Sequence, residues 1–156
     1  MKYAAMPFLF PLSVVLVLCL ITDVGDCRMG WMVFGSCILK HMGFPALLNK
    51  DVRCAANEMF KIFYKMTTRK CINCERYFYC QSNYNAVYNC GQNFKSIHTA
   101  EVISNCREFL QGGTDSRANQ KAKRHGRRGW NCARKYLCAV NCKYNPSHGT
   151  CSLSNC

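Results

Sequence analysis

The feature that most constrains this chain is its cysteine content. The 156-residue sequence holds 14 cysteines, and all but Cys19 follow position 26. In an oxidising compartment such a set forms a disulfide framework, which stabilises a small fold by restricting the unfolded chain. We therefore predict structural half-cystines at Cys27, Cys37, Cys54, Cys71, Cys74, Cys80, Cys90, Cys106, Cys132, Cys138, Cys142, Cys151 and Cys156.

The N-terminal segment has the layout of a secretory signal peptide. Lys2 gives a positive start, an apolar run covers residues 12–21, and polar and acidic residues follow. The alternative, a membrane anchor, needs about 20 apolar residues, roughly twice the length of this run. We predict a signal peptide at residues 1–25 and an extracellular, secreted protein, which agrees with the cysteine content.

Apolar spacing in the remaining chain predicts a mainly α fold. Amphipathic patterns at 54–70, 99–111 and 130–142 place apolar residues on one helix side, and the tyrosine-rich stretch 71–95 is also predicted to be helical. Thr99 is expected to cap the second helix, and Gly112 and Gly113 to end it. The expected architecture is a small disulfide-rich helical bundle with an irregular bridged C-terminal tail.

Charge and composition divide the expected domain. Residues 26–113 form the disulfide-rich helical domain, and residues 130–156 form a cysteine-rich helix and tail. Between them, residues 114–129 are polar and basic, which indicates an exposed loop or linker.

The net charge of +13 is concentrated at the C-terminal end, because no acidic residue follows Asp115. A chain this basic favours anionic partners. We expect an anionic membrane surface or an acidic or receptor protein. Nucleic acid is not expected, since the protein is predicted to be secreted and has no groove-reading or base-stacking motif.

The basic stretch KAKRHGRRGW begins at Lys121 and has three open interpretations. It is an anion-binding surface, a processing site for secretory convertases, or a solvated loop. The residues that would bind the anion or direct the cleavage are Lys121, Lys123, Arg124, Arg127 and Arg128.

No pattern in the sequence indicates catalysis, a cofactor or a metal ion. The four histidines are not paired at metal-ligand spacing, and no serine lies in a nucleophile elbow. The pair Cys71 and Cys74 has C-x-x-C spacing but lacks the βαβ context of a redox motif. We expect a protein that is not an enzyme.

The cysteine spacing in CERYFYCQSNYNAVYNC, followed by NCREFLQ and WNCARKYL, resembles a known family. It is similar, over residues 71–134, to the cysteine-rich helical domains of the GDNF-receptor alpha and growth-arrest-specific family. The resemblance implies a helical bundle that binds a protein ligand. It also implies that five cysteines match half-cystines of that family: Cys74, Cys80, Cys90, Cys106 and Cys132.

Three functional hypotheses follow. The first is a secreted cationic effector of toxin or host-defence type that binds an anionic membrane or a receptor or channel protein. The second is a ligand-binding or signalling module of GDNF-receptor type. The third is a precursor that is cut at the basic stretch to release a cysteine-rich C-terminal peptide.

The odd number of mature cysteines predicts either a free thiol or a bridge between two chains, and we favour the bridge. Thirteen cysteines follow the signal peptide, so at least one has no partner within its own chain. We expect non-reducing electrophoresis of the secreted protein to show a species at about twice the reduced mass. A clean monomer with one titratable thiol would rule out this covalent dimer.

Overall fold

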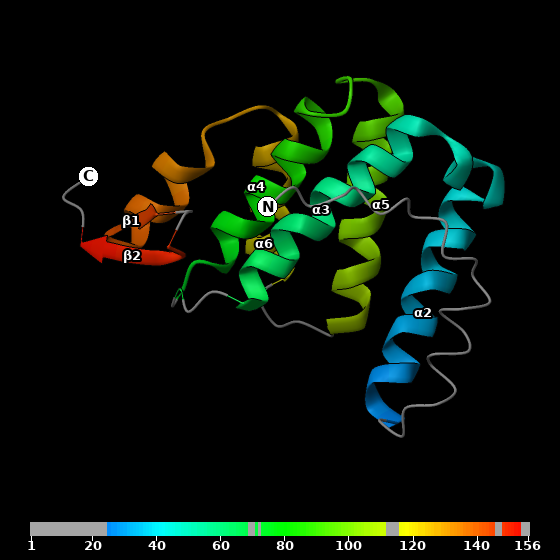
Figure 1. The fold of residues 1–156 in the computed structure, drawn as a ribbon, viewed down its shortest axis with the longest axis horizontal. Coiled ribbons are helices and arrows are strands. Elements are labelled where there is room, and N and C mark those ends of the chain that lie inside the picture. The colour runs from blue at the N-terminus through cyan, green and yellow to red at the C-terminus, as the bar shows by residue number, and fades with distance from the viewer. Residues whose placement is uncertain (1–24, 69–70, 72, 112–115, 146–147, 154–156) are drawn as a thin grey trace, which may run out of the picture.

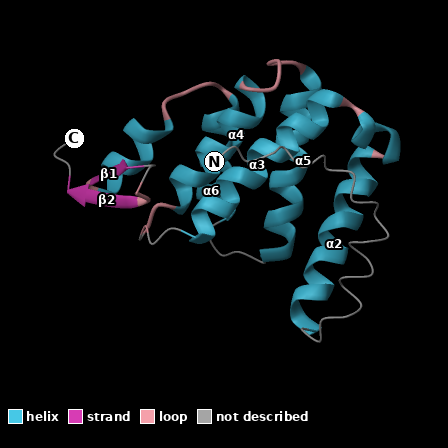
Figure 2. Cartoon of the chain, in the orientation of Figure 1, coloured by secondary structure: helices cyan, strands magenta, loops and turns pink. Residues whose placement is uncertain are grey.

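The computed structural model describes residues 25–68, 71, 73–111, 116–145 and 148–153, and in these ranges the chain is mainly helical (Figure 1). Strands lie only at the C-terminal end of the described chain (Figure 2). The predicted fold class is therefore confirmed. The predicted signal peptide lies outside the described residues, except for position 25, where the described chain begins. The elements are α2 (Gly25–Met42), η1 (Phe44–Leu48), α3 (Lys50–Thr68), α4 (Glu75–Tyr88), α5 (Phe94–Gln111), α6 (Ser116–Arg127), η2 (Ala133–Leu137), η3 (Cys138–Val140), β1 (Cys142–Asn145) and β2 (Thr150–Leu153).

Helix α4 is the element around which the other helices are arranged. Helices α3 and α6 make their most extensive contacts with it, and α5 packs against both α3 and α4. Seven of its residues are buried: Phe78, Tyr79, Cys80, Ser82, Asn83, Ala86 and Val87. A helix that is buried on several sides lies in the core and shows no clear polar face, which explains why its sequence carries a weak periodic signal.

Three clusters of buried side chains form the core of the described chain, and the smallest of them joins α6 to α4 through Tyr79, Cys80, Ala122 and Cys132. The first lies between α3, α4 and α5 and contains Ala55, Met59, Ala86, Val87, Cys90, Ala100 and Ile103. The second contains Ile62, Cys74, Phe78, Leu137 and Cys142. Because Leu137 and Cys142 belong to the second cluster, the C-terminal residues pack onto the bundle through apolar burial as well as through disulfides.

Helix α3 confirms the helix that was predicted from apolar spacing at 54–70. Its buried residues are Val52, Ala55, Met59 and Ile62, which recur at the three- and four-residue spacing of one helix side. Phe63 and Met66 of the same helix are partly buried and pack against the core clusters.

Helix α5 confirms the second predicted helix but begins five residues earlier, at Phe94. The cap is Asn93, whose Oδ1 accepts a hydrogen bond of 3.0 Å from the backbone N–H of Ser96. Thr99, the expected cap, lies inside the helix, is buried, and donates to the carbonyl of Lys95. Thr99 was misassigned because a threonine hydroxyl can satisfy a helical carbonyl one turn back.

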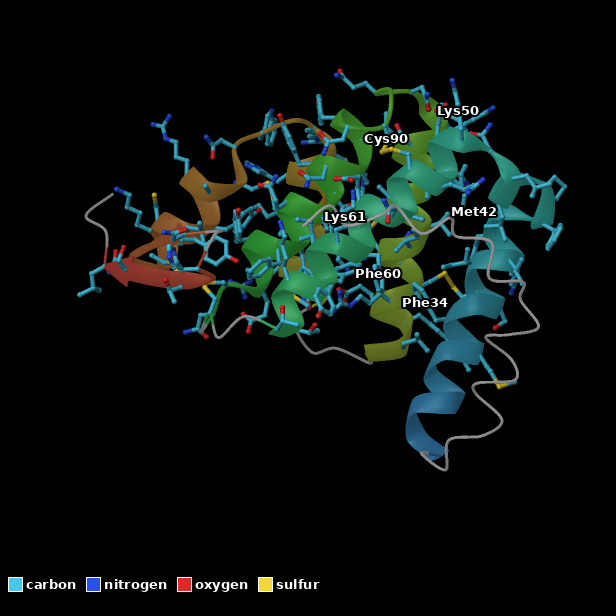
Figure 3. The ribbon with its side chains drawn as sticks, viewed as in Figure 1. Phe34, Met42, Lys50, Phe60, Lys61 and Cys90 are labelled. Atoms are coloured by element: carbon cyan, nitrogen blue, oxygen red, sulfur yellow. A yellow bond between two sulfur atoms is a disulfide. The ribbon has the colours of Figure 1, made fainter. Side chains whose placement is uncertain are left out.

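Helix α2 lies at the edge of the molecule (Figure 1) and packs on α5 and η1. None of its described side chains is fully buried, although Phe34 lies between α2 and α5 and packs against the first core cluster (Figure 3). The disulfide between Cys37 and Cys106 joins it to α5. No helix of the described chain has the length and apolar character needed to cross a bilayer.

The disulfides connect elements that are far apart in the sequence. Cys54 of α3 is bonded to Cys90 after α4, and Cys80 of α4 to Cys132 before η2, with separations of 36 and 52 residues. Closing loops of this length restricts the unfolded chain strongly. The side chain of Cys27 and the whole of Cys156 lie outside the described residues, so the interchain bridge stays a prediction.

The prediction of an exposed basic loop at residues 114–129 is wrong, because Ser116–Arg127 form helix α6. Gly126 allows this helix to lie directly on α4. A Cβ at that position would overlap the carbonyl oxygen of Cys80 and lie 2.9 Å from the amide nitrogen of Tyr84. The segment is therefore a packed helix and not a linker.

Gly129 ends α6 with φ of +78°, a conformation that favours glycine. Its N–H donates to the carbonyl of Gly126 and that of Trp130 to the carbonyl of His125. This pair of bonds is the Schellman arrangement at a helix C-terminus.

The single helix predicted at 130–142 is replaced by two short helical turns, η2 and η3, followed by β1. Asn141 has φ of +50°, which ends the helical turns. Strands β1 and β2 pair antiparallel, with Cys142 opposite Leu153 and Tyr144 opposite Cys151. The tail is bridged as expected, by Cys142 and Cys151, and it contains this short hairpin.

The close contact at Gly126 predicts that replacement by alanine has opposite effects on stability at Gly126 and at Gly35. Gly126→Ala should lower the free energy of unfolding by about 1–3 kcal/mol, because the added methyl group forces α6 away from α4. Gly35→Ala in α2 is the control, since a Cβ there would meet nothing within 4 Å. It should raise the free energy of unfolding by about 0.5–1 kcal/mol.

Urea denaturation followed by far-UV circular dichroism measures both changes. Equal effects of the two substitutions would contradict the close approach of α6 to α4.

Candidate functional site

Helix α6 separates the five basic residues that were predicted to bind an anion or direct cleavage. Lys121, Arg124 and Arg128 are exposed, whereas Lys123 is fully buried and the Arg127 side chain is 8% exposed. Positions 123 and 127 are four residues apart and share a helix side, and the three exposed residues lie on another. The stretch therefore contributes an inner pair of cations and an outer group of cations.

The inner pair is held by acceptors on the neighbouring helices. The Lys123 ammonium lies 2.5 Å from a carboxylate oxygen of Glu108 and donates a hydrogen bond of 3.2 Å to the carbonyl of Ser104. Burial lowers the pKa of Lys123, and the Glu108 carboxylate acts in the opposite direction. Because Glu108 and Ser104 both lie on α5, Lys123 joins α6 to α5.

Arg127 extends this network to α4. One guanidinium nitrogen donates to Oδ1 of Asn83 at 2.8 Å, and another lies 3.5 Å from a carboxylate oxygen of Glu101. Asn83 is fully buried, and its amide nitrogen donates to the carbonyl of Tyr79. Burial lowers the pKa of Arg127, but a guanidinium stays charged in proteins. In this conformation, Lys123 and Arg127 are structural residues of the helix contacts.

The outer cations line a cavity of about 260 Å³ beside α6. Its lining residues are Lys121, Arg124, His125, Arg128, Trp130 and Lys135, and none of them is acidic. The Arg128 guanidinium lies 5.3 Å from the centre of the Trp130 ring, and the His125 ring meets the same indole edge-on at 4.9 Å. His125, Trp130 and Lys135 were not among the predicted site residues, although the helical spacing of 121, 124, 125 and 128 indicates a shared face.

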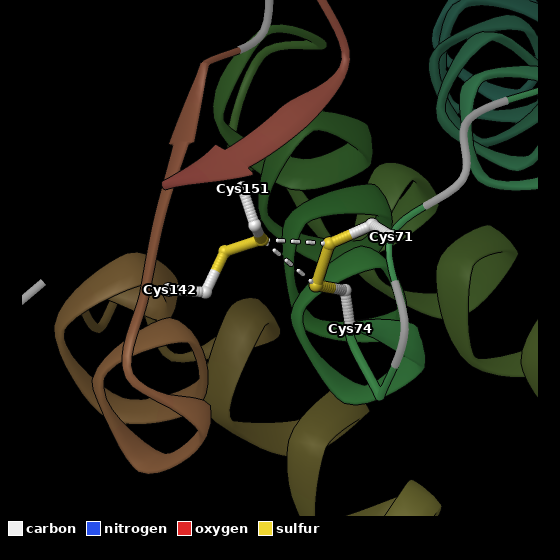
Figure 4. Close-up of side chains that lie close together, drawn as sticks. All are labelled: Cys71, Cys74, Cys142 and Cys151. Atoms are coloured by element: carbon white, nitrogen blue, oxygen red, sulfur yellow. Dashed lines mark hydrogen bonds between the residues drawn. A yellow bond between two sulfur atoms is a disulfide. The ribbon is translucent and has the colours of Figure 1, made fainter. Parts of the chain in front are cut away.

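A second group of reactive atoms lies between the loop before α4 and the hairpin. The four sulfur atoms of Cys71, Cys74, Cys142 and Cys151 lie within 4.8 Å of one another (Figure 4). Cys71 is bonded to Cys74 and Cys142 to Cys151, and the sulfurs of Cys71 and Cys151 are 3.0 Å apart. Four cysteines in such a group could hold a metal ion only as thiolates, because a half-cystine has no thiolate to offer.

The other predicted half-cystines in the described chain are also paired. Cys138 is disulfide-bonded, and Cys142 is bonded to Cys151. No catalytic residue was predicted, and the absence of enzymatic activity stays an expectation for this chain.

Large apolar side chains form a further feature of the described surface. Phe60 and Tyr64 on α3 are 54% and 62% exposed, and Phe109 on α5 is 73% exposed. Others are Met32 and Leu39 on α2, Phe44 and Leu48 on η1, and Phe94 and Ile97 on α5. Single exposed apolar residues are ordinary, whereas a contiguous apolar patch marks a surface that binds a partner or a lipid.

The buried pair of Lys123 and Glu108 gives a stability prediction with a matched control. Lys123→Met should lower the free energy of unfolding by about 3–5 kcal/mol, because it leaves the Glu108 carboxylate buried without its cation. Lys121→Met removes the same charge from the exposed side of α6 and should change stability by about 0.5 kcal/mol or less. Thermal or urea denaturation measures the difference.

The double variant Lys123→Met with Glu108→Met tests the cause. It should recover most of the lost stability, because replacing both members of a buried ion pair by apolar residues is often neutral. If Lys123→Met and Lys121→Met were equally tolerated, the ion pair would not be buried in solution.

Comparison with known proteins places residues 47–144 in the family model described as "Serum amyloid A protein". The serum amyloid A protein of Notamacropus eugenii is 36% identical over 85 residues, which cover 51% of this chain and 65% of that protein. The serum amyloid A-2 protein of Oryctolagus cuniculus is 33% identical over 92 residues, which cover 56% of this chain and 72% of that protein. The chain thus spans less than two thirds of the length of the first relative.

This match corrects two predictions. The resemblance to GDNF-receptor alpha domains is wrong, because the same region, including Cys74, Cys80, Cys90, Cys106 and Cys132, lies within the serum amyloid A match. The hypotheses of a toxin or host-defence effector, of a GDNF-receptor-like module and of a processed precursor are overturned by the same finding.

The predicted extracellular localisation is confirmed, because serum amyloid A homologues are secreted plasma proteins. The family model matches from η1 through α3, α4, α5 and α6 to β1, well over half of the chain. The chain therefore belongs to the serum amyloid A family.

Proposed function

We propose that this protein is an acute-phase, apolipoprotein-like plasma protein that binds neutral lipid surfaces through exposed apolar side chains of its helices. The observation that carries the proposal is the exposure of large apolar residues on α2, η1, α3 and α5. Family membership supports it, because serum amyloid A homologues indicate an apolipoprotein-like secreted protein.

The exposed face of α3 shows how such a contact would form. Phe60 and Tyr64 are four residues apart and share one side of the helix, next to the exposed Lys61 and Lys65. Apolar side chains with flanking lysines suit the boundary between acyl chains and headgroups, where the lysine stems lie along the surface and the charges reach water.

Helix α2 offers a second contact of the same kind. Met32 and Leu39 are 64% and 36% exposed, and none of its described side chains is fully buried. A helix held to the bundle by limited burial and a disulfide can cover a lipid surface without exposing the core. Fully burying a large apolar side chain contributes about 1.5–3 kcal/mol, so a few such residues suffice for binding.

Binding to phosphatidylcholine vesicles tests the proposal, because a neutral surface removes general attraction between the basic protein and anions. Phe60→Gln with Tyr64→Gln should weaken binding at least about tenfold, which corresponds to about 1.4 kcal/mol. Lys61→Gln with Lys65→Gln is the control on the same helix and should leave binding to neutral vesicles nearly unchanged.

Flotation of vesicles over a range of salt concentrations provides the measurement. Apolar binding should persist at high salt, because salt screens charges and does not weaken apolar burial. Wild-type protein that stays unbound, or that loses binding as salt increases, would reject the proposal.

A further inference from the structure

The cavity beside α6 brings cations from two elements together. Lys121, Arg124 and Arg128 come from one side of α6 and the residue after its end, and Lys135 comes from η2. All four are exposed. Four like charges around one small cavity repel one another. This repulsion is unfavourable unless solvent or a bound anion compensates the charges.

Among the described residues, these cations differ from Lys123 and Arg127 of α6 in having no acidic partner. Lys123 pairs with Glu108 and Arg127 with Glu101, both on α5. Within the described chain, Lys121, Arg124, Arg128 and Lys135 form no ion pair with a carboxylate, and no acidic residue lines the cavity. The helix therefore satisfies its inner charges and leaves the outer group unpaired.

His125 also lines the cavity and is 9% exposed. Burial lowers its pKa, a hydrogen bond with the backbone of Asn131 acts in the opposite direction, and the nearby Lys135 lowers the pKa further. Its Nδ1 is buried, so the ring contributes a wall of the cavity and adds no acidic group to it.

Trp130 shapes the wall of the cavity. The indole contacts both the Arg128 guanidinium and the His125 ring, and it is 50% exposed. Trp130 also follows Gly129, whose φ of +78° fixes the direction of the chain after α6. Arg128, which precedes this turn, and Lys135, which follows it, are therefore positioned by a defined backbone conformation.

We propose that this cavity binds a compact, multiply charged phosphate of the pyrophosphate class. Two guanidinium groups offer paired N–H donors that match the oxygens of a phosphate, and two ammonium groups add point charges. A volume of about 260 Å³ suits a small ion, since it lies below the usual range for larger organic ligands.

The site is distinct from the proposed lipid-binding surface. The cavity is formed by α6, the turn after it and η2, whereas the apolar side chains invoked above lie on α2, η1, α3 and α5. The two proposals use different residues and different probes, so either can fail without the other.

Isothermal titration calorimetry of the full, disulfide-bonded protein with sodium pyrophosphate tests the site. Arg124→Gln with Arg128→Gln should weaken binding at least about tenfold, because both guanidinium donors are lost. Arg134→Gln with Lys143→Gln is the control, since it removes the same total charge from exposed residues that do not line the cavity. It should weaken binding less than about threefold, as expected for the general field of the protein.

A conservative variant protects the test against misfolding. Arg124→Lys with Arg128→Lys keeps the charge and should still weaken pyrophosphate binding at least about threefold, because lysine has no paired donors. Wild-type protein should also show a higher melting temperature in pyrophosphate than in sulfate of equal ionic strength.

Two results would overturn the site. One is an equal loss of affinity in the cavity and control variants, which would mean diffuse attraction by the net charge. The other is binding to vesicles that contain phosphatidic acid without competition from pyrophosphate, which would mean that a lipid headgroup, not a soluble phosphate, is the ligand.

Discussion

The approach of α6 to α4 at Gly126 is the contact on which the rest of the C-terminal half depends. A side chain at this position would overlap the carbonyl oxygen of Cys80, so only glycine permits the two backbones to lie at this distance. The same residue of α4 is bonded through its sulfur to Cys132, which follows α6. The chain is thus fixed to α4 at Gly126 by close packing and at Cys132 by a covalent bond.

This contact fixes which side of α6 faces α4, and it thereby sets which of the cations on α6 lie inside and which lie outside. With Ala122 and Gly126 against α4, the positions of Lys123 and Arg127 lie toward α5, where Glu108 and Glu101 compensate them. A buried ion pair adds little net stability, because desolvation offsets most of the attraction. The ion pair favours this rotation of α6, because a rotation that kept Lys123 buried but moved it away from Glu108 would leave the cation without its acceptor. The remaining cations are then left together on the outside.

Apolar periodicity predicted α3 and α5 because each of these helices buries part of its surface in the core. The same reasoning failed for α6, whose buried side consists of Ala122, His125, Gly126 and two cations and therefore shows no apolar stripe. Charge spacing carried the missing signal, since 121, 124 and 128 recur at helical intervals and Gly129 follows as a helix end. Which cations turn inward could not be predicted, because it depends on carboxylates of α5 that are distant in sequence.

Cysteine spacing was informative about the class of protein and misleading about the family. The number of cysteines correctly indicated a stapled secreted fold, but the intervals between Cys74, Cys80 and Cys90 suggested a family that the chain does not belong to. The reason is physical. Helices of similar length packed side by side bring cysteines together at similar intervals in unrelated bundles, so spacing reports helix packing and not ancestry.

The described surface thus combines two kinds of binding feature with different physical origins. The apolar side chains of α2, α3 and α5 act through burial, which does not depend on screening by salt. The cations beside α6 act through charge, which is screened over about 8 Å at physiological ionic strength. Because the inner cations of α6 are neutralised within the protein, the outer group can bind or release an anion without disturbing the helix contacts. The proposed binding of a lipid surface and the proposed binding of a soluble anion therefore rest on separate residues and on separate physical effects.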